Sequence, residues 1–101
     1  MALIKDRIEG DLVLEENTSI HGMVVGCVTV SPRVNLQLHG MIIGELLLLP
    51  RSEVFVHGMV NGKIINRGGS LRIFGQVNGK VLEEGGETIV APNASIQGGD
   101  L

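Results

Sequence analysis

The side chains with the clearest chemical potential are three histidines at a constant interval. His21, His39 and His57 stand 18 residues apart, and each is followed by Gly-Met. Imidazole binds transition metals, and it is the side chain that titrates nearest to neutral pH. Either use requires the three rings to lie close together, so the elements that position them decide which chemistry is available.

The histidines belong to a six-residue motif that recurs along the chain. His-Gly-Met-x-x-Gly begins at residues 21, 39 and 57, and an altered copy, Phe-Gly-Gln-Val-Asn-Gly, begins at residue 74, so the spacings are 18, 18 and 17. A motif kept at near-fixed spacing indicates one structural unit stacked on itself. Eighteen residues are too few for helix-pair repeats, and the paired glycines disfavour a helix, but one coil of three short strands fits.

A strict alternation extends from Ile20 to Ile64. Even positions in this span hold only Val, Ile, Leu, Gly, Pro or Ser, and every charged residue is at an odd position. Because side chains of a strand alternate between its faces, the even positions are predicted to fill the interior. One residue of the repeat is missing near Arg67-Gly68-Gly69, so the inward set is predicted to become Leu71, Ile73, Val77 and Val81.

These patterns predict an all-β, single-domain β-helix (solenoid) of about five coils with a 17–18-residue repeat. Residues 1–19 form the entry coil, residues 20–81 the regular repeats and residues 82–101 an irregular closing coil. In the closing coil, Glu83–Glu87 is expected to be an acidic bend, and Ile89, Ala94 and Ile96 are expected to point inward.

An antiparallel meander remains the alternative fold. Asn61-Gly62 and Asn78-Gly79 are typical of type I′ hairpin turns. The same position in the other copies holds Val25-Gly26 and Ile43-Gly44, which are poor hairpin turns. The stacked coil is therefore favoured.

Composition narrows the class of protein further. With two Phe, no Trp and no Tyr, the core must be aliphatic, and a formal net charge of −3 disfavours nucleic-acid binding. The single cysteine, Cys27, allows no internal disulfide and fits a reducing, cytoplasmic location. No segment approaches the ~20 apolar residues needed to cross a bilayer, and the N-terminus is charged where a signal peptide is apolar. We therefore expect no membrane insertion.

The repeat resembles that of a known family. An apolar-x-Gly-x-apolar-x-Gly-x-apolar pattern occupies residues 20–28, 38–46, 56–64 and 73–81, and the closing Ala94-Ser95-Ile96-Gln97-Gly98 completes it. This pattern resembles the bactofilins, a bacterial polymer-forming cytoskeletal family, over about residues 8–98. The resemblance implies a right-handed β-helix of triangular cross-section whose open ends stack into filaments without nucleotide.

Many positions that alternation places outside are apolar, which is unusual for a solvated surface. An apolar patch marks an interface, and Met is favoured on surfaces that must adapt to a partner. We expect either a second copy of the chain or a different protein to cover this outward face, and ordinary exposure to solvent is the remaining alternative. The candidate protein-interaction residues are Met23, Val25, Met41, Ile43, Leu47, Leu49, Phe55, Met59 and Phe74.

The histidines are predicted to form an outward ladder of stacked rings rather than a metal site. A straight column of ligands converges poorly, and no carboxylate aligns with it. Protonation of neighbouring rings predicts weaker association at pH 5.5 than at pH 7.5. Nothing near Cys27 activates a thiolate, and no further catalytic group accompanies Glu45 with His21 or His39. No catalytic residue, metal or cofactor is therefore predicted.

The sequence thus predicts a non-enzymatic structural or scaffold protein of bactofilin type. It would assemble with copies of itself through the ends of the β-helix, an apolar side face, or both, because neither end offers a clear cap. The alternative is a small cytosolic protein-binding module, of inhibitor or immunity type, that uses the outward Met, Val, Ile and Leu residues to capture another protein.

Overall fold

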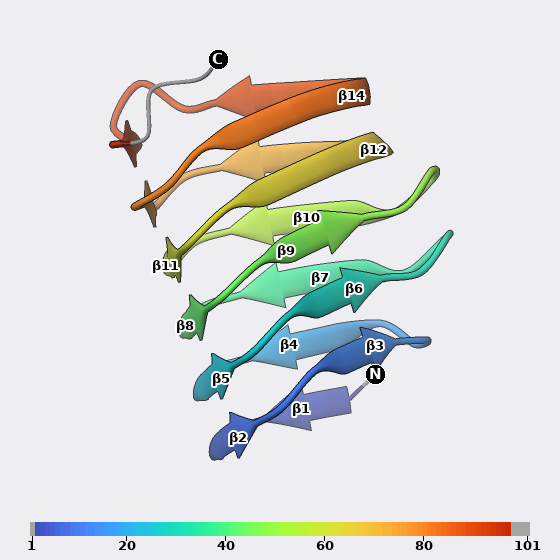
Figure 1. Cartoon of the computed structure of the whole chain (residues 1–101), viewed down its shortest axis with the longest axis vertical. Coiled ribbons are helices and arrows are strands. Elements are labelled where there is room, and N and C mark those ends of the chain that lie inside the picture. Colours follow the sequence, from blue (N-terminus) through green and yellow to red (C-terminus); the bar gives the residue numbers. More distant parts are fainter. Residues whose placement is uncertain (1, 98–101) are drawn as a thin grey trace.

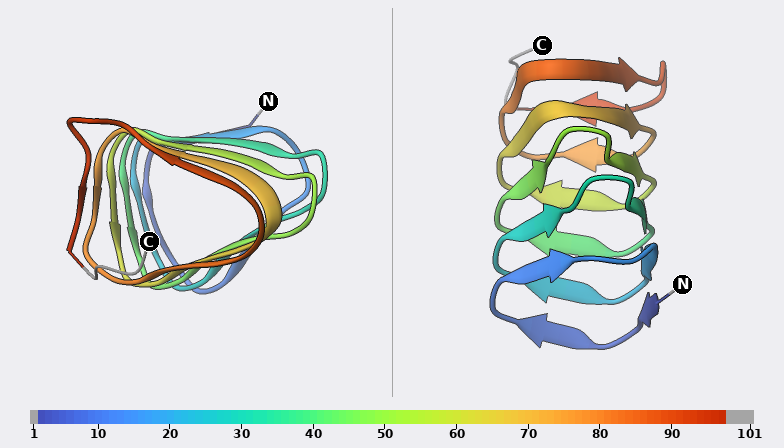
Figure 2. Two further views of the ribbon diagram at one scale, coloured as in Figure 1. Left: turned by 90° about the horizontal axis from the view of Figure 1, so that it is seen from above. Right: turned by 90° about the vertical axis from the view of Figure 1, so that its right-hand side faces the viewer.

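Short strands joined at tight corners wind into a parallel β-solenoid in the computed structural model, which describes residues 2–97. Seen along its axis, the solenoid has three sides (Figure 2). In Figure 1 the front strands run rightward and the rear strands leftward while the chain climbs from the N-terminal to the C-terminal end, so the coil is right-handed. No helix occurs within residues 2–97.

Each coil contributes one strand to each of three faces. The first face contains β1 (Ala2–Ile4), β4 (Thr18–Ile20), β7 (Asn35–Leu38), β10 (Glu53–Val56) and the second halves of β12 (Ile64–Ile73) and β14 (Val81–Val90). The second face contains β2 (Arg7–Glu9), β5 (Met23–Val25), β8 (Met41–Ile43), β11 (Met59–Asn61), β13 (Gln76–Val77) and β15 (Ser95–Ile96). The third face contains β3 (Leu12–Leu14), β6 (Val28–Val30), β9 (Leu46–Leu48) and the first halves of β12 and β14. Because β12 and β14 continue around a corner, hydrogen bonding joins the first and third faces into one nine-stranded sheet.

Backbone hydrogen bonds hold each coil in register with the next. On the first face, the column Ala2, Thr18, Leu36, Val54 and Leu71 is paired step by step. Successive equivalent residues are therefore 16, 18, 18 and 17 positions apart. Every pairing among the described strands is parallel, so the antiparallel meander is wrong and the predicted solenoid is confirmed.

The interior is aliphatic, as the composition predicts. Val, Leu and Ile supply every buried hydrophobic side chain of residues 2–97. The predicted parity is confirmed on both sides of the missing residue, since the set contains the predicted even positions up to Ile64 and then Leu71, Ile73, Val77 and Val81. Burial of such side chains stabilises the fold by about 1.5–3 kcal/mol each.

Glycines occupy the corner between the first and second faces. Gly22, Gly40 and Gly58 lie one above another, and a Cβ added to Gly40 would collide with the carbonyl oxygen of Gly22. That oxygen accepts the backbone N–H of Met41 at 3.0 Å. The coils approach too closely at this corner for any side chain, which explains why glycine recurs there.

The corner between the third and first faces changes along the axis. In the second and third coils it has four residues, and Arg33 and Arg51 adopt the left-handed conformation at φ 68° and 70°. In the fourth coil, Asn66 pairs with Leu48 and Ser70 pairs with Glu53, so only residues 67–69 form the corner. The shorter corner reverses the alternation, as predicted.

A buried amide stabilises this shorter corner. Asn66 is fully buried at an inward position. Its Oδ1 accepts the backbone N–H groups of Gly69 and Gly68 at 2.8 and 3.2 Å, and its Nδ2 donates to the Glu87 carbonyl and the Thr88 hydroxyl at 3.1 and 3.2 Å. The side chain is therefore fully bonded, and it links β12 to the second half of β14.

The closing coil differs from two expectations. Residues 83–87 lie within strand β14, paired with β12, instead of forming a bend. Ile89 is 45% exposed above Arg72, while Val90 lies above the inward Ile73. The physical reason is that the Gly85-Gly86 corner repeats the short corner below it and reverses the alternation a second time.

The remaining expectations for the closing coil fall into two groups. Ala94 and Ile96 pack against the core, which confirms their predicted orientation. Gly98, part of the family-like closing segment, lies outside the described residues.

Candidate functional site: a grooved side face and two open ends

The three histidines form a stacked ladder at the edge of the second face. The ring centroids of His21 and His39 are 4.8 Å apart with 16° between planes, and those of His39 and His57 are 4.8 Å apart with 6°. Phe74 continues the histidine ladder above His57 at 5.1 Å and 7°. All four side chains are exposed, and their spacing is that of the coils that carry them.

The environment of the histidine ladder disfavours protonation of its middle ring. Partial burial of His39, and then the charges that His57 and His21 acquire, lower the pKa of His39 from its ordinary value. His57 Nε2 lies 3.3 Å from Gln37 Oε1, and Lys5 occupies the position one coil below His21. The middle ring of the ladder, His39, is therefore mainly neutral at pH 7.

This geometry offers little for metal or acid–base chemistry. Zinc needs about four ligands that converge tetrahedrally, whereas near-parallel rings set their nitrogens side by side. No group of three or more His, Cys, Asp or Glu side chains in residues 2–97 is arranged to hold a metal ion. His39 and Glu45 flank opposite ends of β8, and Cys27 is an exposed free thiol.

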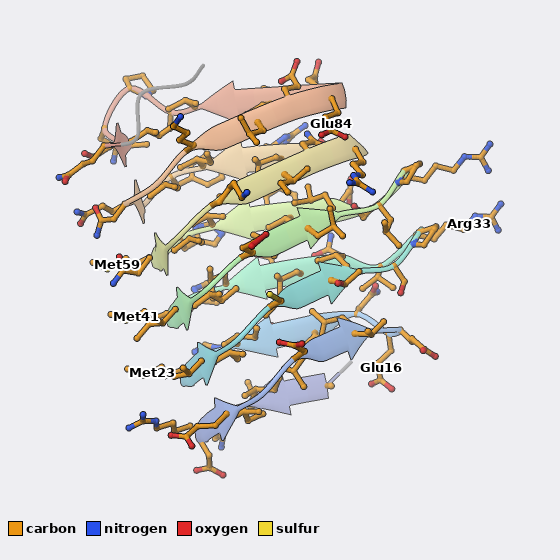
Figure 3. The ribbon with its side chains drawn as sticks, in the orientation of Figure 1. Glu16, Met23, Arg33, Met41, Met59 and Glu84 are labelled. Atoms are coloured by element: carbon orange, nitrogen blue, oxygen red, sulfur yellow. The ribbon has the colours of Figure 1, made fainter. Side chains whose placement is uncertain are left out.

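A groove runs beside the histidine ladder. The methionines of β5, β8 and β11 are paired in register and point outward together as the Met column (Met23, Met41 and Met59; Figure 3). Between this column and the ladder lies a groove of about 850 Å³, with glycines of the stacked corner among its lining residues. It extends from the Lys5–Arg7 segment to Asn93 and Ser95. Because glycine has no side chain, the recurring corner itself creates the hollow.

The nine predicted interaction residues do not form one surface. Met23, Val25, Met41, Ile43 and Met59 share the second face, and Phe74 borders it. Leu47 lies on the third face in β9, Phe55 on the first face in β10, and Leu49 at the corner between those faces. Alternation separates inside from outside but carries no information about which of three outer faces a residue occupies, so the expectation of a single apolar face is wrong.

Both ends of the solenoid expose strand edges. At the N-terminal end, β1, β2 and β3 each pair with a strand on one side only, and the same holds for β14 and β15 at the other end within residues 2–97. Half-buried core side chains lie at both ends, namely Ile4, Ile8 and Leu12 at one and Ala94 and Ile96 at the other. Val90, also in the last coil, is 37% exposed. The ends thus combine unpaired backbone groups with aliphatic surface.

Charge is distributed unevenly along the corner between the third and first faces. Arg33 projects from its middle, while Glu16 and Glu84 lie toward the two ends (Figure 3). Arg51 is exposed at the same corner, between β9 and β10. Arg67 Nε contacts Glu84 Oε1 at 3.2 Å. Both terminal coils are therefore acidic at this corner.

Sequence reasoning missed one feature of the second face. In the first coil, alternate residues Lys5, Arg7, Glu9 and Asp11 are all exposed and run from basic to acidic across this face. The signal was visible as the alternating pattern Lys-x-Arg-x-Glu-x-Asp, but nothing in the sequence showed that these four side chains stand beside the Met column.

Comparisons with known proteins add no assignment. No protein-family model matches the sequence, and neither the curated proteins nor the solved structures yield a match. Among residues 2–97, no helix has the length and apolar character required to span a membrane.

Proposed function

We propose that this chain is a non-enzymatic structural protein that polymerises end to end, in the manner of the bactofilins that its repeat resembles. The observation that supports this proposal best is the pair of open ends. Each offers parallel strand edges, and each carries partly exposed aliphatic residues that continue the interior.

The ends are suited to each other physically. Contact between the first coil of one copy and the last coil of the next would continue the ladders of all three faces. It would bury Ile4, Ile8 and Leu12 against Val90 and its neighbours. Each 100 Å² of apolar surface removed from water would contribute about 2.5 kcal/mol before the cost of association. Repulsion between the acidic terminal corners opposes this contact, and salt near 150 mM screens it.

Two adjacent residues of β14 provide a matched test. Val90 lies above the inward Ile73, whereas Ile89 lies above the outward Arg72. Val90→Glu would set a charge in the end contact at a site that water reaches in the single molecule. Ile89→Glu adds the same charge to an exposed side position. Both variants should remain folded.

The assay is sedimentation velocity with negative-stain microscopy at 150 mM salt. We expect filaments for the wild type and for Ile89→Glu, and no end-to-end species for Val90→Glu. A wild type that stays monomeric or dimeric at high concentration, or filaments unaffected by Val90→Glu, would refute end-to-end assembly.

A second candidate function is a protein-binding module. It is favoured by the 850 Å³ groove beside the Met column, since apolar grooves with adaptable methionines suit the capture of another protein. The same sedimentation experiment separates the two candidates, because a binding module would show no high-mass species by itself.

A further inference from the structure

The outward side chains of the second face change character along the solenoid axis. In the first coil they are Lys5, Arg7, Glu9 and Asp11. The second and third coils carry apolar residues at the two central positions: Met23 with Val25, and Met41 with Ile43. The fourth coil carries Met59 with Asn61 there, and the fifth carries Gln76 with Asn78. Charged, apolar and amide side chains therefore follow one another along the axis of this face.

The charged coil is self-complementary across the face. Two cations stand on the side of the histidine ladder, and two carboxylates stand on the opposite side. Arg7 and Glu9 already contact each other at 2.9 Å with side chains 64% and 69% exposed, and Asp11 Oδ1 accepts the backbone N–H of Cys27 at 3.0 Å. These exposed groups retain room for further partners.

We propose that the second face is the interface of a two-fold dimer in which two copies of this chain lie side by side with their axes parallel. A two-fold axis parallel to the solenoids keeps every coil level with the same coil of the second copy and exchanges the left and right sides of the face. Arg7 then meets Glu9 of the second copy, and Lys5 meets Asp11. Met23 and Met41 meet the Val25 and Ile43 positions of the second copy.

The spacing of the side chains argues for a second copy as the occupant. The ladder and its neighbouring columns repeat every 4.8 Å along the axis. An extended peptide laid along the groove advances about 3.3 Å per residue and falls out of step, whereas another stack of parallel strands has the same repeat.

Charge favours the parallel over the antiparallel arrangement. An antiparallel dimer centred on the apolar second and third coils sets the first coil opposite the fourth. Arg7 would then face Met59, Glu9 would face Asn61, and only Asp11 would gain an opposite charge, at Lys63. The parallel dimer gives each of the four alternating outward charges (Lys5, Arg7, Glu9 and Asp11) an opposite partner.

This inference rests on the proposed self-association but concerns the side face, so its test must be separated from contact at the ends. The Val90→Glu background serves this purpose because it removes end-to-end growth while the second face is unchanged. In this background we expect a monomer–dimer equilibrium by sedimentation. A chain that is monomeric in the millimolar range overturns the side dimer, and filaments of the wild type would still support the proposed function.

A charge exchange tests the pairing directly. In the Val90→Glu background, Arg7→Glu sets like charges across the interface and should raise the dimer dissociation constant at least tenfold. Adding Glu9→Arg to Arg7→Glu should restore it to within about threefold, because the exchanged pair is again complementary. Arg72→Glu, on the first face, is the control and should change nothing. An unchanged dissociation constant in Arg7→Glu, or a failure of the exchange to restore it, overturns the proposed pairing.

A cysteine variant tests the parallel orientation. His21 and Cys27 flank opposite ends of β5, so the two-fold axis brings His21 of one copy opposite Cys27 of the other. Six extended residues span roughly 20 Å, too far for a disulfide within one chain. His21→Cys treated with diamide should therefore give disulfide-linked dimers, and Gln37→Cys, on the first face, should not. Crosslinking of the wild type through Cys27 alone would indicate the antiparallel dimer and overturn the parallel one.

Discussion

Replacement of Asn66 by leucine should destabilise the solenoid although it makes the interior more apolar. Asn66 is fully buried and makes four hydrogen bonds, and its register partner one coil below is Leu48. The equivalent position one coil below therefore already accommodates a buried leucine side chain. The polar groups that the amide satisfies, however, do not occur around Leu48.

The magnitude follows from these contacts. Four hydrogen bonds contribute about 1 kcal/mol each, and the N–H of Gly69 is left without an acceptor in a buried corner at a further cost of about 1–3 kcal/mol. Burial of the leucine side chain returns about 2 kcal/mol. We therefore expect the free energy of unfolding to fall by about 3–5 kcal/mol in urea denaturation.

Hydrogen exchange should locate the effect of this change. In Asn66→Leu the amides of Gly68 and Gly69 should lose protection before those of the second and third coils do. Thr88→Val removes only one of the four bonds and should cost less than about 1 kcal/mol. A stability within about 0.5 kcal/mol of the wild type in Asn66→Leu would show that the amide does not hold this corner together.

Three further perturbations test the interior, the glycine corner and the histidine ladder. Ile42→Glu should abolish folding, measured by circular dichroism, because it buries an unpaired charge. Ile43→Glu, at an outward position, should lower the free energy of unfolding by less than about 1 kcal/mol. The reverse result would invert the assignment of inside and outside. Gly40→Ala should cost about 1–3 kcal/mol by forcing coils apart, and Gly85→Ala, whose added Cβ would meet nothing closer than 3.6 Å, should be nearly neutral in the same denaturation assay. The pKa of His39 is lowered in the folded protein, so its contribution to stability is complete above about pH 6.5 and is lost as the pH falls through the lowered value. Urea denaturation should therefore show a lower free energy of unfolding at pH 5 than at pH 7.5. The difference between the two pH values should be smaller in His39→Gln.

Much of the architecture could be predicted because its cause is local and periodic. A side-chain period of two separates Ile42 from Ile43, and steric exclusion at the stacked corner demands glycine at Gly40 and its equivalents. Both effects repeat in every coil, so the sequence shows them several times. The same redundancy made the missing residue before Leu71 visible as a break in the pattern.

The features that could not be predicted depend on the geometry of the corners or on contacts between residues that are distant in the sequence. Ile89 was misassigned because one further short corner, at Gly85-Gly86, reverses the alternation a second time. The Gly-Gly pair that marks this corner, 17 residues after Gly68-Gly69, was interpreted as part of an acidic bend. Asn66 reads as an ordinary polar residue until its four partners are assembled by the fold. Leu47 and Phe55 lie on different faces although both are outward, since the face is set by the angle turned at each corner.

The most direct test of the account is X-ray fibre diffraction from aligned assemblies of the full chain. Solenoids stacked end to end carry their strand spacing along the filament, so the account predicts a reflection near 4.8 Å on the meridian. A 4.8 Å reflection on the equator, or the absence of any aligned assembly, would contradict the claim that open coils build this polymer.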